Sequence, residues 1–348
     1  MTGYRAPMAR TKSWRRERQG DLYVPTVPTA QEVLDKAFKG ASTIDAQDPS
    51  AIYRAKKNAM SRVDSVTDSI QVTLGRVVQK MSLLDRLHPF YEGVLATQFD
   101  LAELRKSVAT VDWCRGQVVD VCRKASMQLA RTKNRKFIEQ KRKEVYGRVS
   151  SLLERIAPEL ALLGKARDAM RSLDAIDPAV PTIVVAGYPN VGKSALVGRL
   201  STAEPEVAAY PFTTTRVTVG HFFHKGRAFQ VVDTPGILDR PMAERNPVER
   251  RAMSAIAHLP AMLLFLVDPT GEGGTTMEAQ ERLLDEIRET YPGKDVLVIE
   301  TKADLLKREG GGDRPRVSSV SGEGIDELKA ELIKRLPQPE IEWVIREG

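Results

Sequence analysis

The chain has 348 residues, of which 42% are apolar and 28% are charged. This ordinary globular mixture excludes a fibrous or disordered chain, and the length favours about two domains, each able to bury a core. No segment approaches the roughly 20 apolar residues of a membrane helix, and the first 20 residues have no apolar core like that of a signal peptide. Cys114 and Cys122 lie eight residues apart on one predicted helix, too far apart for a disulfide, so we expect a reducing, cytoplasmic location.

The charge is divided unevenly along the chain. Residues 1–180 contain 32 Lys and Arg against 21 Asp and Glu, which predicts that this half meets a polyanion. We interpret its densest basic run as a surface for a phosphate backbone, and a plain solvated helix face is the alternative. No signature of sequence-specific RNA reading accompanies the run. Its basic residues are Arg123, Lys124, Arg131, Lys133, Arg135, Lys136, Lys141, Arg142, Lys143 and Arg148.

Helical periodicity dominates the first half. Residues 1–23 form a basic arm with little to bury, which we expect to be mobile or ordered only on a partner. Thr29 and Glu32 form a capping box for a short helix that continues to about residue 39. Apolar residues at spacings of three and four predict further helices over about 50–87, 100–131, 134–156 and 158–173. Long amphipathic helices with short breaks predict an all-α antiparallel bundle over 24–176.

Two of these helices carry explicit predictions of their buried faces. The expected face of the first comprises Val63, Val66, Ile70, Leu74, Val77, Met81 and Leu84. That of the second comprises Leu101, Leu104, Val108, Val111, Val118, Val121 and Leu129.

A phosphate-binding loop opens the second half, which we assign as one domain over 177–337 with a tail at 338–348. The β-branched run Thr182–Ala186 predicts a buried strand, and a helix is expected from Ala195 to Leu200. Between them stand Gly187, Tyr188, Pro189, Asn190, Val191, Gly192, Lys193 and Ser194. In this strand–loop–helix context, backbone N–H groups surround the phosphates of a nucleotide, Lys193 reaches the β- and γ-phosphates, and Ser194 binds Mg²⁺.

Two segments that can sense the γ-phosphate follow. Phe212, Thr213 and Thr214 precede a strand over 217–224, and a threonine hydroxyl there can complete the Mg²⁺ shell. The strand 229–233 ends in Asp233, which would hold Mg²⁺ through water, while the Gly236 N–H can sense the γ-phosphate. The nucleotide contacts expected after this strand are Asp233, Thr234, Pro235 and Gly236.

The predicted base-reading residues follow two more strands, at 262–268 and 296–300. Thr301 and Lys302 lead to Asp304, whose carboxylate can accept hydrogen bonds from N1–H and the 2-amino group of guanine. Adenine lacks this donor pair, so Asp304 argues for GTP over ATP. The segment Ser318, Ser319 and Val320 precedes a helix over 325–336, and its N–H groups could contact guanine O6. The alternating elements predict an α/β P-loop GTPase domain with a doubly wound, mostly parallel sheet.

The whole chain resembles the nucleolar GTP-binding protein 1 family, whose GTPase domain is of the Obg type. It looks like a short, archaeal-like form without the long C-terminal extension of eukaryotic members. The segments that carry the resemblance are Val24–Ala30, Leu87–Tyr91, Gly187–Ser194, Tyr210–Thr214, Val231–Asp239, Arg245–Asn246 and Ala255–Leu259. The resemblance implies Thr214 as the Mg²⁺-binding switch residue, together with Ser194 and Asp233.

Four positions qualify this picture. Thr301 stands where the family motif usually has Asn, so it can make one hydrogen bond that ties the loop but can loosen nucleotide affinity. Ile237 stands where many GTPases place a water-orienting Gln, which predicts slow intrinsic hydrolysis. The short segment around Gly310–Gly312 predicts a reduced wrapping helix. Asn190 matches the residue with which potassium-stimulated relatives coordinate K⁺, and local support of the loop is the alternative.

The motifs predict a GTP-hydrolysing protein whose catalytic candidates are Lys193, Asn190, Thr214 and Gly236, and the resemblance implies an assembly factor of the large ribosomal subunit. By resemblance its partners are large-subunit ribosomal RNA and precursor particles, with Mg²⁺ and GTP or GDP bound, K⁺ as a candidate, no membrane, and a monomer off the ribosome. One alternative is an RNA-binding placeholder that binds GTP with negligible turnover. Another is a GTPase of tRNA modification or translation.

Overall fold

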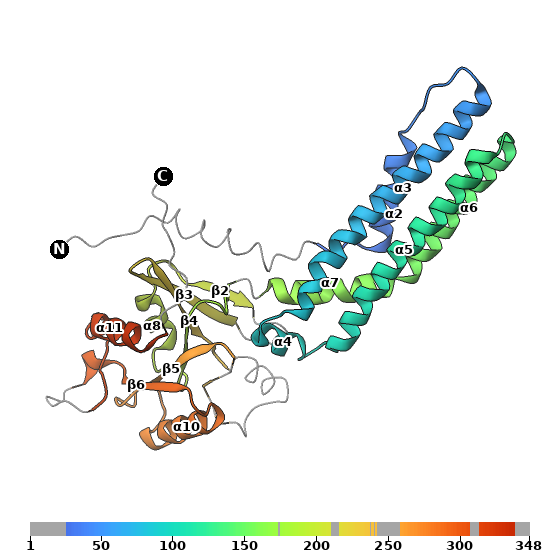
Figure 1. The fold of residues 1–348 in the computed structure, drawn as a ribbon. Coiled ribbons are helices and arrows are strands. Elements are labelled where there is room, and N and C mark those ends of the chain that lie inside the picture. The colour runs from blue at the N-terminus through green and yellow to red at the C-terminus, as the bar shows by residue number, and fades with distance from the viewer. Residues whose placement is uncertain are drawn as a thin grey trace. The chain divides into compact units, whose positions relative to one another are not determined.

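The computed structural model describes residues 26–172, 175–209, 216–236, 238–239, 241, 258–306 and 313–337. The predicted arm and tail lie outside this range. Two compact units divide the chain (Figure 1). One contains residues 26–86 and 99–169, and the other contains 87–98 and the residues from 170 onward.

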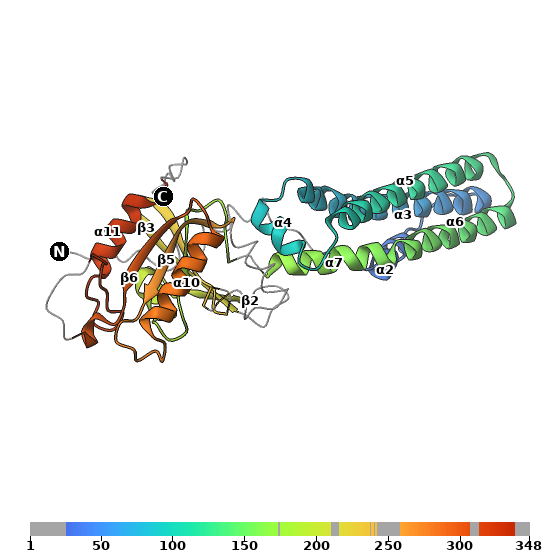
Figure 2. The same ribbon diagram turned by 90° about the horizontal axis from the view of Figure 1, so that it is seen from below.

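The first unit is a bundle of long helices, as predicted. In Figure 2, α3, α5 and α6 run side by side, and α3 packs against both of the others. The short helix α2 lies against α3 and α6. The bounds are α2 Ala30–Ser42, α3 Ala51–Met81 with a 3-10 turn η1 Ser82–Asp85, α5 Leu101–Arg131, α6 Arg135–Arg155 and α7 Ala157–Arg171.

Side chains at the predicted helix starts satisfy the free backbone N–H groups. The capping box is present, because the Glu32 N–H donates to Thr29 Oγ1 at 3.2 Å and the Thr29 N–H donates to Glu32 Oε2 at 2.8 Å. Asp100 accepts from the N–H of Ala102 at the start of α5, and Asn134 caps α6. Short polar residues therefore set where these helices begin.

The two predicted buried faces fared differently. All seven apolar residues assigned to α3 and its extension are buried. On α5 the prediction was wrong for Leu101, Val108 and Val121, which are only half-buried. Small residues complete the face instead, because α3 and α5 pack closely along their length. The buried residues of α5 are Leu104, Ser107, Val111, Cys114, Val118, Cys122, Ala125 and Leu129, and both cysteines are free thiols.

The second unit contains a helix that the sequence analysis missed, α4 Pro89–Leu95. His88 caps it by accepting from the Phe90 N–H, and Tyr91 Oη donates to the Ile176 carbonyl at 2.7 Å. Residues 87–98 therefore pack with the second unit, although the sequence division placed them in the bundle. Pro89 occupies the first turn of α4, where proline is tolerated.

A six-stranded sheet forms the centre of the second unit, in the order β2-β3-β4-β1-β5-β6. Strands β4, β1, β5 and β6 are parallel, whereas β3 is antiparallel to β4 and to β2. The predicted doubly wound, mostly parallel sheet is confirmed, and only the short edge strand β2 was missed. The bounds are β1 Thr182–Ala186, β2 Glu206–Ala209, β3 Arg216–His224, β4 Arg227–Asp233, β5 Pro260–Val267 and β6 Asp295–Glu300.

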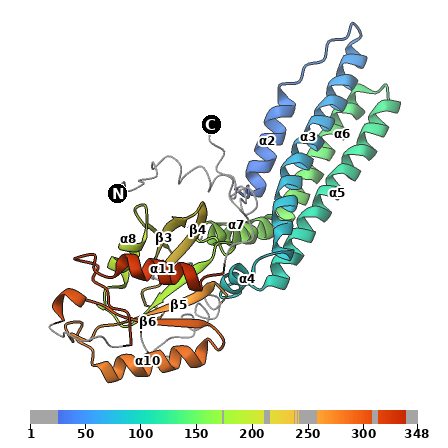
Figure 3. The same cartoon turned by 60° about the vertical axis from the view of Figure 1, so that its left-hand side comes forward.

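Helices cover both faces of this sheet. The helices α8 Lys193–Leu200 and α11 Ile325–Arg335 share one core with alternate residues of β1 and β5. The helix α10 Met277–Thr290 packs against β5 apart from that core (Figure 3). Because successive strand residues point to opposite faces, β5 can be buried on both sides. The loops of the candidate site follow the carboxyl ends of the parallel strands.

Candidate nucleotide-binding site

The phosphate-binding loop joins β1 to α8 and has the backbone that its glycines permit. Gly187 has φ +136°, and a Cβ there would lie 2.5 Å from the Leu266 carbonyl oxygen. Gly192, with φ +97°, is the N-cap of α8. Any L side chain at Gly187 would clash with the end of β5. The loop therefore brings its backbone to the N-terminus of α8, which is an anion-binding position.

Lys193 lies folded over this loop. Its Nζ donates to the carbonyls of Gly187 and Tyr188, at 2.8 Å each, and the residue is only 8% exposed. Burial lowers the pKa of the Lys193 ammonium, and the charges of Asp233 and Asp239 oppose part of that shift. A poorly hydrated ammonium at the mouth of an anion site interacts strongly with phosphate oxygens.

Ser194 and Asp233 meet beneath the loop. The Ser194 hydroxyl donates to Asp233 Oδ2 at 2.6 Å, and Asp233 is fully buried at the end of β4. Burial raises the pKa of the Asp233 carboxyl, while Ser194 and the Lys193 charge lower it. Among the described residues, Asp233 Oδ1 has no hydrogen-bond partner.

These two side chains fit Mg²⁺. A buried carboxylate oxygen without a partner, beside a hydroxyl, is the oxygen donor set that this cation prefers. Bound there, Mg²⁺ would neutralise charge on the β- and γ-phosphates. The third predicted ligand, Thr214, lies outside the described residues, as do Phe212 and Thr213.

The segment after β4 turns back onto the phosphate loop. The Gly187 N–H donates to the Leu238 carbonyl at 3.1 Å, and the Gly236 N–H donates to Asp239 Oδ2 at 2.7 Å. Gly236 has φ +77°, which favours glycine. Asp239 was not among the predicted site residues, although a carboxylate three residues after Gly236 was a visible signal. Ile237 lies outside the described residues.

Thr301 ties the base-reading loop to the phosphate loop, as expected. It is 3% exposed, and its Oγ1 lies 2.8 Å from the Val191 carbonyl oxygen and 3.1 Å from that of Val267. A hydroxyl has one proton, so it can donate fully to only one of these two carbonyls. The amide of an Asn would supply two N–H donors.

The structure joins Asp304 to the second base-reading segment. Asp304 is exposed within a 3-10 turn, and its Oδ1 accepts from the hydroxyl of Ser318. Ser318 is fully buried, and its Oγ also accepts from the N–H groups of Val320 and Ser321. One hydroxyl therefore orients the carboxylate and shapes the loop that follows it.

Arg199 is a further contributor that the sequence analysis did not single out. From α8 its guanidinium donates to the carbonyl of Ser319 at 2.6 Å and to that of Val320 at 2.8 Å. The helix that begins at the phosphate loop thereby also holds the loop at the base.

A loop after β5 completes this end of the sheet. Lys302, with φ +58°, forms an ion pair with Asp268 at 2.6 Å, and Asp268 is 1% exposed. Burial alone would raise the pKa of Asp268, but hydrogen bonds from Lys302 and Thr270 bring it below its usual value. Gly273 donates its N–H to Asp268, and a Cβ at Gly273 would lie 3.7 Å from the carbonyl oxygens of Pro189 and Asn190.

The glycine-rich stretch at 271–274 was the available signal for this loop. It follows a strand end, where backbone often approaches another chain segment closely.

Asn190 is exposed and has φ +64°, a backbone conformation that Asn tolerates better than most residues. Among the described residues its side-chain amide has no hydrogen-bond partner. The described residues therefore show no side-chain hydrogen bond through which Asn190 would support the loop, which was the alternative to K⁺ binding.

The fold and this arrangement of loops define a P-loop GTPase domain that follows a helical bundle. Residues 182–302 match the model of the 50S ribosome-binding GTPase family, and residues 23–177 match that of the NOG1 N-terminal helical domain. An uncharacterised protein of Methanocaldococcus jannaschii is 32% identical, over 82% of this chain and 81% of its own length. The chain belongs to the nucleolar GTP-binding protein 1 family.

Relatives that carry this name include larger proteins. The Arabidopsis thaliana nucleolar GTP-binding protein 1 is 30% identical over 89% of this chain and 46% of its own length. That of Saccharomyces cerevisiae is 29% identical over 91% and 48%. The chain spans about half the length of these relatives.

Solved structures show weaker likeness. The G domain of the Thermotoga maritima FeoB iron transporter is 26% identical over 45% of this chain and 98% of its own, with a TM-score of 0.38. A Plasmodium falciparum structure assigned to nucleolar GTP-binding protein 1 is 28% identical over 46% and 88%, with a TM-score of 0.41.

The described part of the chain shows neither a clustered metal site nor a membrane-spanning helix. No group of three or more His, Cys, Asp or Glu side chains lies together as a metal site there. Within the same residues, no helix is long and apolar enough to cross a membrane.

Proposed function

We propose that the protein binds and hydrolyses GTP with Mg²⁺, and that its nucleotide state changes its affinity for ribosomal RNA in large-subunit precursors. The observation that carries the nucleotide half is the Ser194–Asp233 pair beneath Lys193, with a buried carboxylate oxygen left for a cation. The hydrogen bond from Ser318 to Asp304 supports guanine as the base, because it holds the Asp304 carboxylate against the loop that Arg199 tethers at Ser319. A carboxylate held in this way can accept the two hydrogen bonds that guanine donates.

The part of the proposal that concerns ribosomal RNA is supported first by the names of relatives. Residues 182–302 match a family described as a 50S ribosome-binding GTPase, and curated relatives are named nucleolar GTP-binding protein 1. The first description names the 50S ribosome, and the second names the nucleolus. We extend this to the present chain as a proposal.

The basic end of the bundle supports RNA as the partner. We call the ten basic residues identified above, which lie on α5, on α6 and in the connection between them, the basic surface. Three of them are ion-paired, since Arg123 contacts Asp120 while Lys141 and Arg148 share Glu144. Six exposed cations have no ion-pair partner among the described residues, namely Lys124, Arg131, Lys133, Arg135, Lys136 and Lys143. Their charge is available to phosphates, which supports the RNA interpretation, while a plain solvated helix face is still the alternative.

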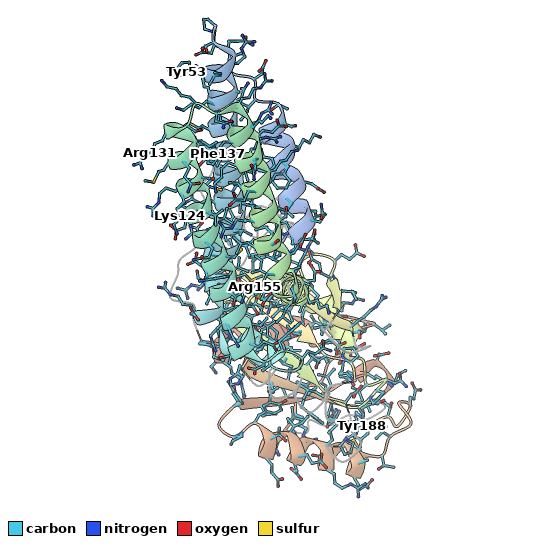
Figure 4. All side chains as sticks on the ribbon, turned by 90° about the vertical axis from the view of Figure 1, so that its right-hand side faces the viewer. Tyr53, Lys124, Arg131, Phe137, Arg155 and Tyr188 are labelled. Atoms are coloured by element: carbon cyan, nitrogen blue, oxygen red, sulfur yellow. The ribbon has the colours of Figure 1, made fainter. Side chains whose placement is uncertain are left out.

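Apolar side chains accompany this charge. Met127 is 54% exposed, Phe137 39% and Tyr53 52%, although all three lie on packed helices. Figure 4 shows Tyr53, Arg131 and Phe137 toward the same end of the bundle, where Lys56 Nζ also donates to the Ala130 carbonyl. Exposed rings beside cations suit unpaired RNA bases, which stack on aromatic faces.

Co-sedimentation tests the whole proposal. Purified protein would be mixed with large-subunit precursors in GTP, in GDP and in a non-hydrolysable GTP analogue. We expect the bound fraction to depend on the nucleotide, and equal binding in all three would contradict a nucleotide-controlled RNA affinity.

A K⁺ ion held partly by Asn190 is part of the proposal for hydrolysis. Such an ion would stabilise the charge that develops on the phosphates, as an arginine finger does in other GTPases. We expect faster turnover in K⁺ than in Na⁺ at equal ionic strength, and loss of this difference in Asn190→Ala. Equal rates in the two salts would remove K⁺ from the mechanism.

The second candidate function is a placeholder that binds GTP and RNA but hardly turns GTP over. Ile237 favours it, because an apolar side chain cannot orient the attacking water. A single-turnover assay with and without ribosomal particles separates the two functions. Hydrolysis that stays negligible with particles present would support the placeholder.

A further inference from the structure

The carboxylate of Asp239 stands where the segment after β4 meets the phosphate loop. Its Oδ2 accepts from the Gly236 N–H at 2.7 Å, and the residue is 9% exposed. The neighbouring Leu238 carbonyl accepts from the Gly187 N–H at 3.1 Å. Two consecutive residues of this segment are thus tied to glycines that the nucleotide site uses.

The electrostatic surroundings of Asp239 are those of a phosphate. Its negative charge acts on the Lys193 ammonium and on the Asp233 carboxyl. Asp239 Oδ1 is buried and has no hydrogen-bond partner among the described residues. A buried anion with one oxygen on a backbone N–H and an ammonium nearby has the same chemistry as a bound phosphoryl oxygen.

The γ-phosphate of GTP is expected to contact the groups that Asp239 contacts or acts on, namely the Gly236 N–H and the Lys193 ammonium. In a P-loop GTPase the lysine of the loop reaches the β- and γ-phosphates, and γ-phosphate contacts order the switch segments. The Gly236 N–H is the expected donor here. One N–H cannot donate fully to both a carboxylate and a phosphate. Two anions that approach the same N–H also repel one another.

We propose that Asp239 competes with the γ-phosphate for the Gly236 N–H and thereby sets how strongly the protein prefers GTP over GDP. GDP lacks the γ-phosphate, so it binds with the Asp239–Gly236 hydrogen bond intact. GTP must displace the carboxylate, which moves the segment after β4 away from the phosphate loop. Asp239 is then a positioning residue that links the presence of a third phosphate to the position of this segment.

This inference rests on the proposed nucleotide binding and goes beyond it. Asp239 could instead orient the attacking water, since Ile237 cannot. The two roles differ in what they change. A residue that competes with phosphate alters the ratio of two affinities, whereas a water-orienting residue alters turnover and leaves that ratio unchanged.

The experiment compares the affinities of wild type, Asp239→Ala and Asp239→Asn for GDP and a non-hydrolysable GTP analogue by calorimetry with Mg²⁺. In Asp239→Ala we expect the analogue-to-GDP affinity ratio to rise about tenfold, the scale of one charge-assisted hydrogen bond. Asp239→Asn keeps an oxygen that can accept from Gly236 but loses the charge, so its ratio should rise less. Asp285→Ala, an exposed acid on α10, should leave the ratio at the wild-type value.

A second readout follows the hydrogen bond itself. Amide exchange of Gly236 without added nucleotide should be slow in wild type and in Asp239→Asn and fast in Asp239→Ala, with equal thermal melts confirming that all variants fold. A ratio that stays within twofold of wild type in both Asp239 variants would overturn the inference, and so would a fall in the ratio. Wild type that binds neither nucleotide would overturn the proposed function as well, which distinguishes the two failures.

Discussion

Lys193 shows how one buried side chain can prepare a site for a highly charged ligand. Its two hydrogen bonds to loop carbonyls hold the ammonium in place while burial removes much of its water. A phosphate that replaces these carbonyls gains a charge-assisted interaction without first paying to order the lysine. The same folded loop would present its N–H groups to the ligand.

We therefore expect Lys193→Ala to weaken GTP binding by about 100-fold, since two charge-assisted hydrogen bonds at about 1.5 kcal/mol each are lost. Calorimetric titration with GTP and Mg²⁺ measures this loss. Lys334→Ala, at an exposed position near the end of α11, is the control and should bind as wild type does. Retained affinity in Lys193→Ala would mean that other groups hold the phosphates.

Asp304 carries the prediction of base specificity. In Asp304→Asn the amide oxygen can still accept from Ser318, so the loop should keep its shape. The hydrogen-bond pattern offered to the base is changed, however, and it matches the exchanged donor and acceptor of xanthine. We expect GTP affinity to fall by about 100-fold and xanthosine triphosphate to become the better ligand, measured by competition. An unchanged preference for GTP would place base recognition elsewhere.

At the residue scale, the sequence revealed the groups of recognised motifs and missed those that support them. Lys193 and Ser194 were predicted from the spacing of a strand, a loop and a helix, and Asp233 and Asp304 from motifs at the ends of two strands. Arg199 and Asp268 act through contacts between segments far apart in sequence, and Asp239 acts through a local hydrogen bond outside the recognised motifs. Such contacts depend on how loops fold over one another, which periodicity does not encode. Four motif residues, Phe212, Thr213, Thr214 and Ile237, lie outside the described residues.

Among the elements, α8 has two tasks. Its N-terminus faces the phosphate loop, while Arg199 near its other end holds the carbonyls of Ser319 and Val320. Val320 itself is 78% exposed, so little packing holds this loop. The position of the loop at Ser319 and Val320 therefore depends on the helix that begins at the phosphate-binding loop.

Arg199→Ala should separate these tasks. We expect affinity for guanosine, which contacts only the base end, to fall by about tenfold because the loop loses both tethers. The unfolding free energy should change by less than about 1 kcal/mol, since the contacts are exposed. Arg288→Ala, on exposed α10, is the matched control for loss of an arginine. Guanosine affinity equal to wild type would show that the Ser318 network alone holds the loop.

Element boundaries were predictable wherever capping or strand signals were strong. The long helices and the parallel strands follow from periodicity, and Thr29 and Asn134 mark two helix starts. The errors have one physical origin, which is that burial depends on neighbours as well as on residue type. Ser107 and Cys114 are buried, with the Cys114 thiol against the Leu152 carbonyl of α6, while Val108 is only half-buried. The edge strand β2 escaped notice because it is short and Val207 in it is exposed.

On the scale of the whole molecule, the two units carry different parts of the proposed function. The bundle carries the exposed basic surface, and the second unit carries the nucleotide site. The chain crosses between the two units after residues 86, 98 and 169. The first of these crossings leads into α4, whose Tyr91 is anchored to the Ile176 carbonyl just before β1. This hydrogen bond fixes the segment that follows the first crossing to the chain that leads into β1, within the second unit.

Charge reversal at the basic surface tests the RNA contact at this scale. We expect the triple variant Lys133→Glu, Lys136→Glu and Lys143→Glu to weaken binding to a large-subunit ribosomal RNA transcript. The slope of log affinity against log salt should also flatten by about 2, since each lost phosphate contact removes about 0.7–0.9 from it. Filter binding over a salt series measures both effects.

The matched control reverses three other exposed lysines of the same unit, Lys39, Lys106 and Lys165, and so changes the net charge equally. If only overall charge attracted RNA, both triple variants would lose affinity and slope alike. If RNA binds at the basic surface, the control should keep the wild-type slope because none of its lysines contacts a phosphate. Equal losses would therefore reject a local site, and unchanged binding in the first variant would reject the basic surface altogether.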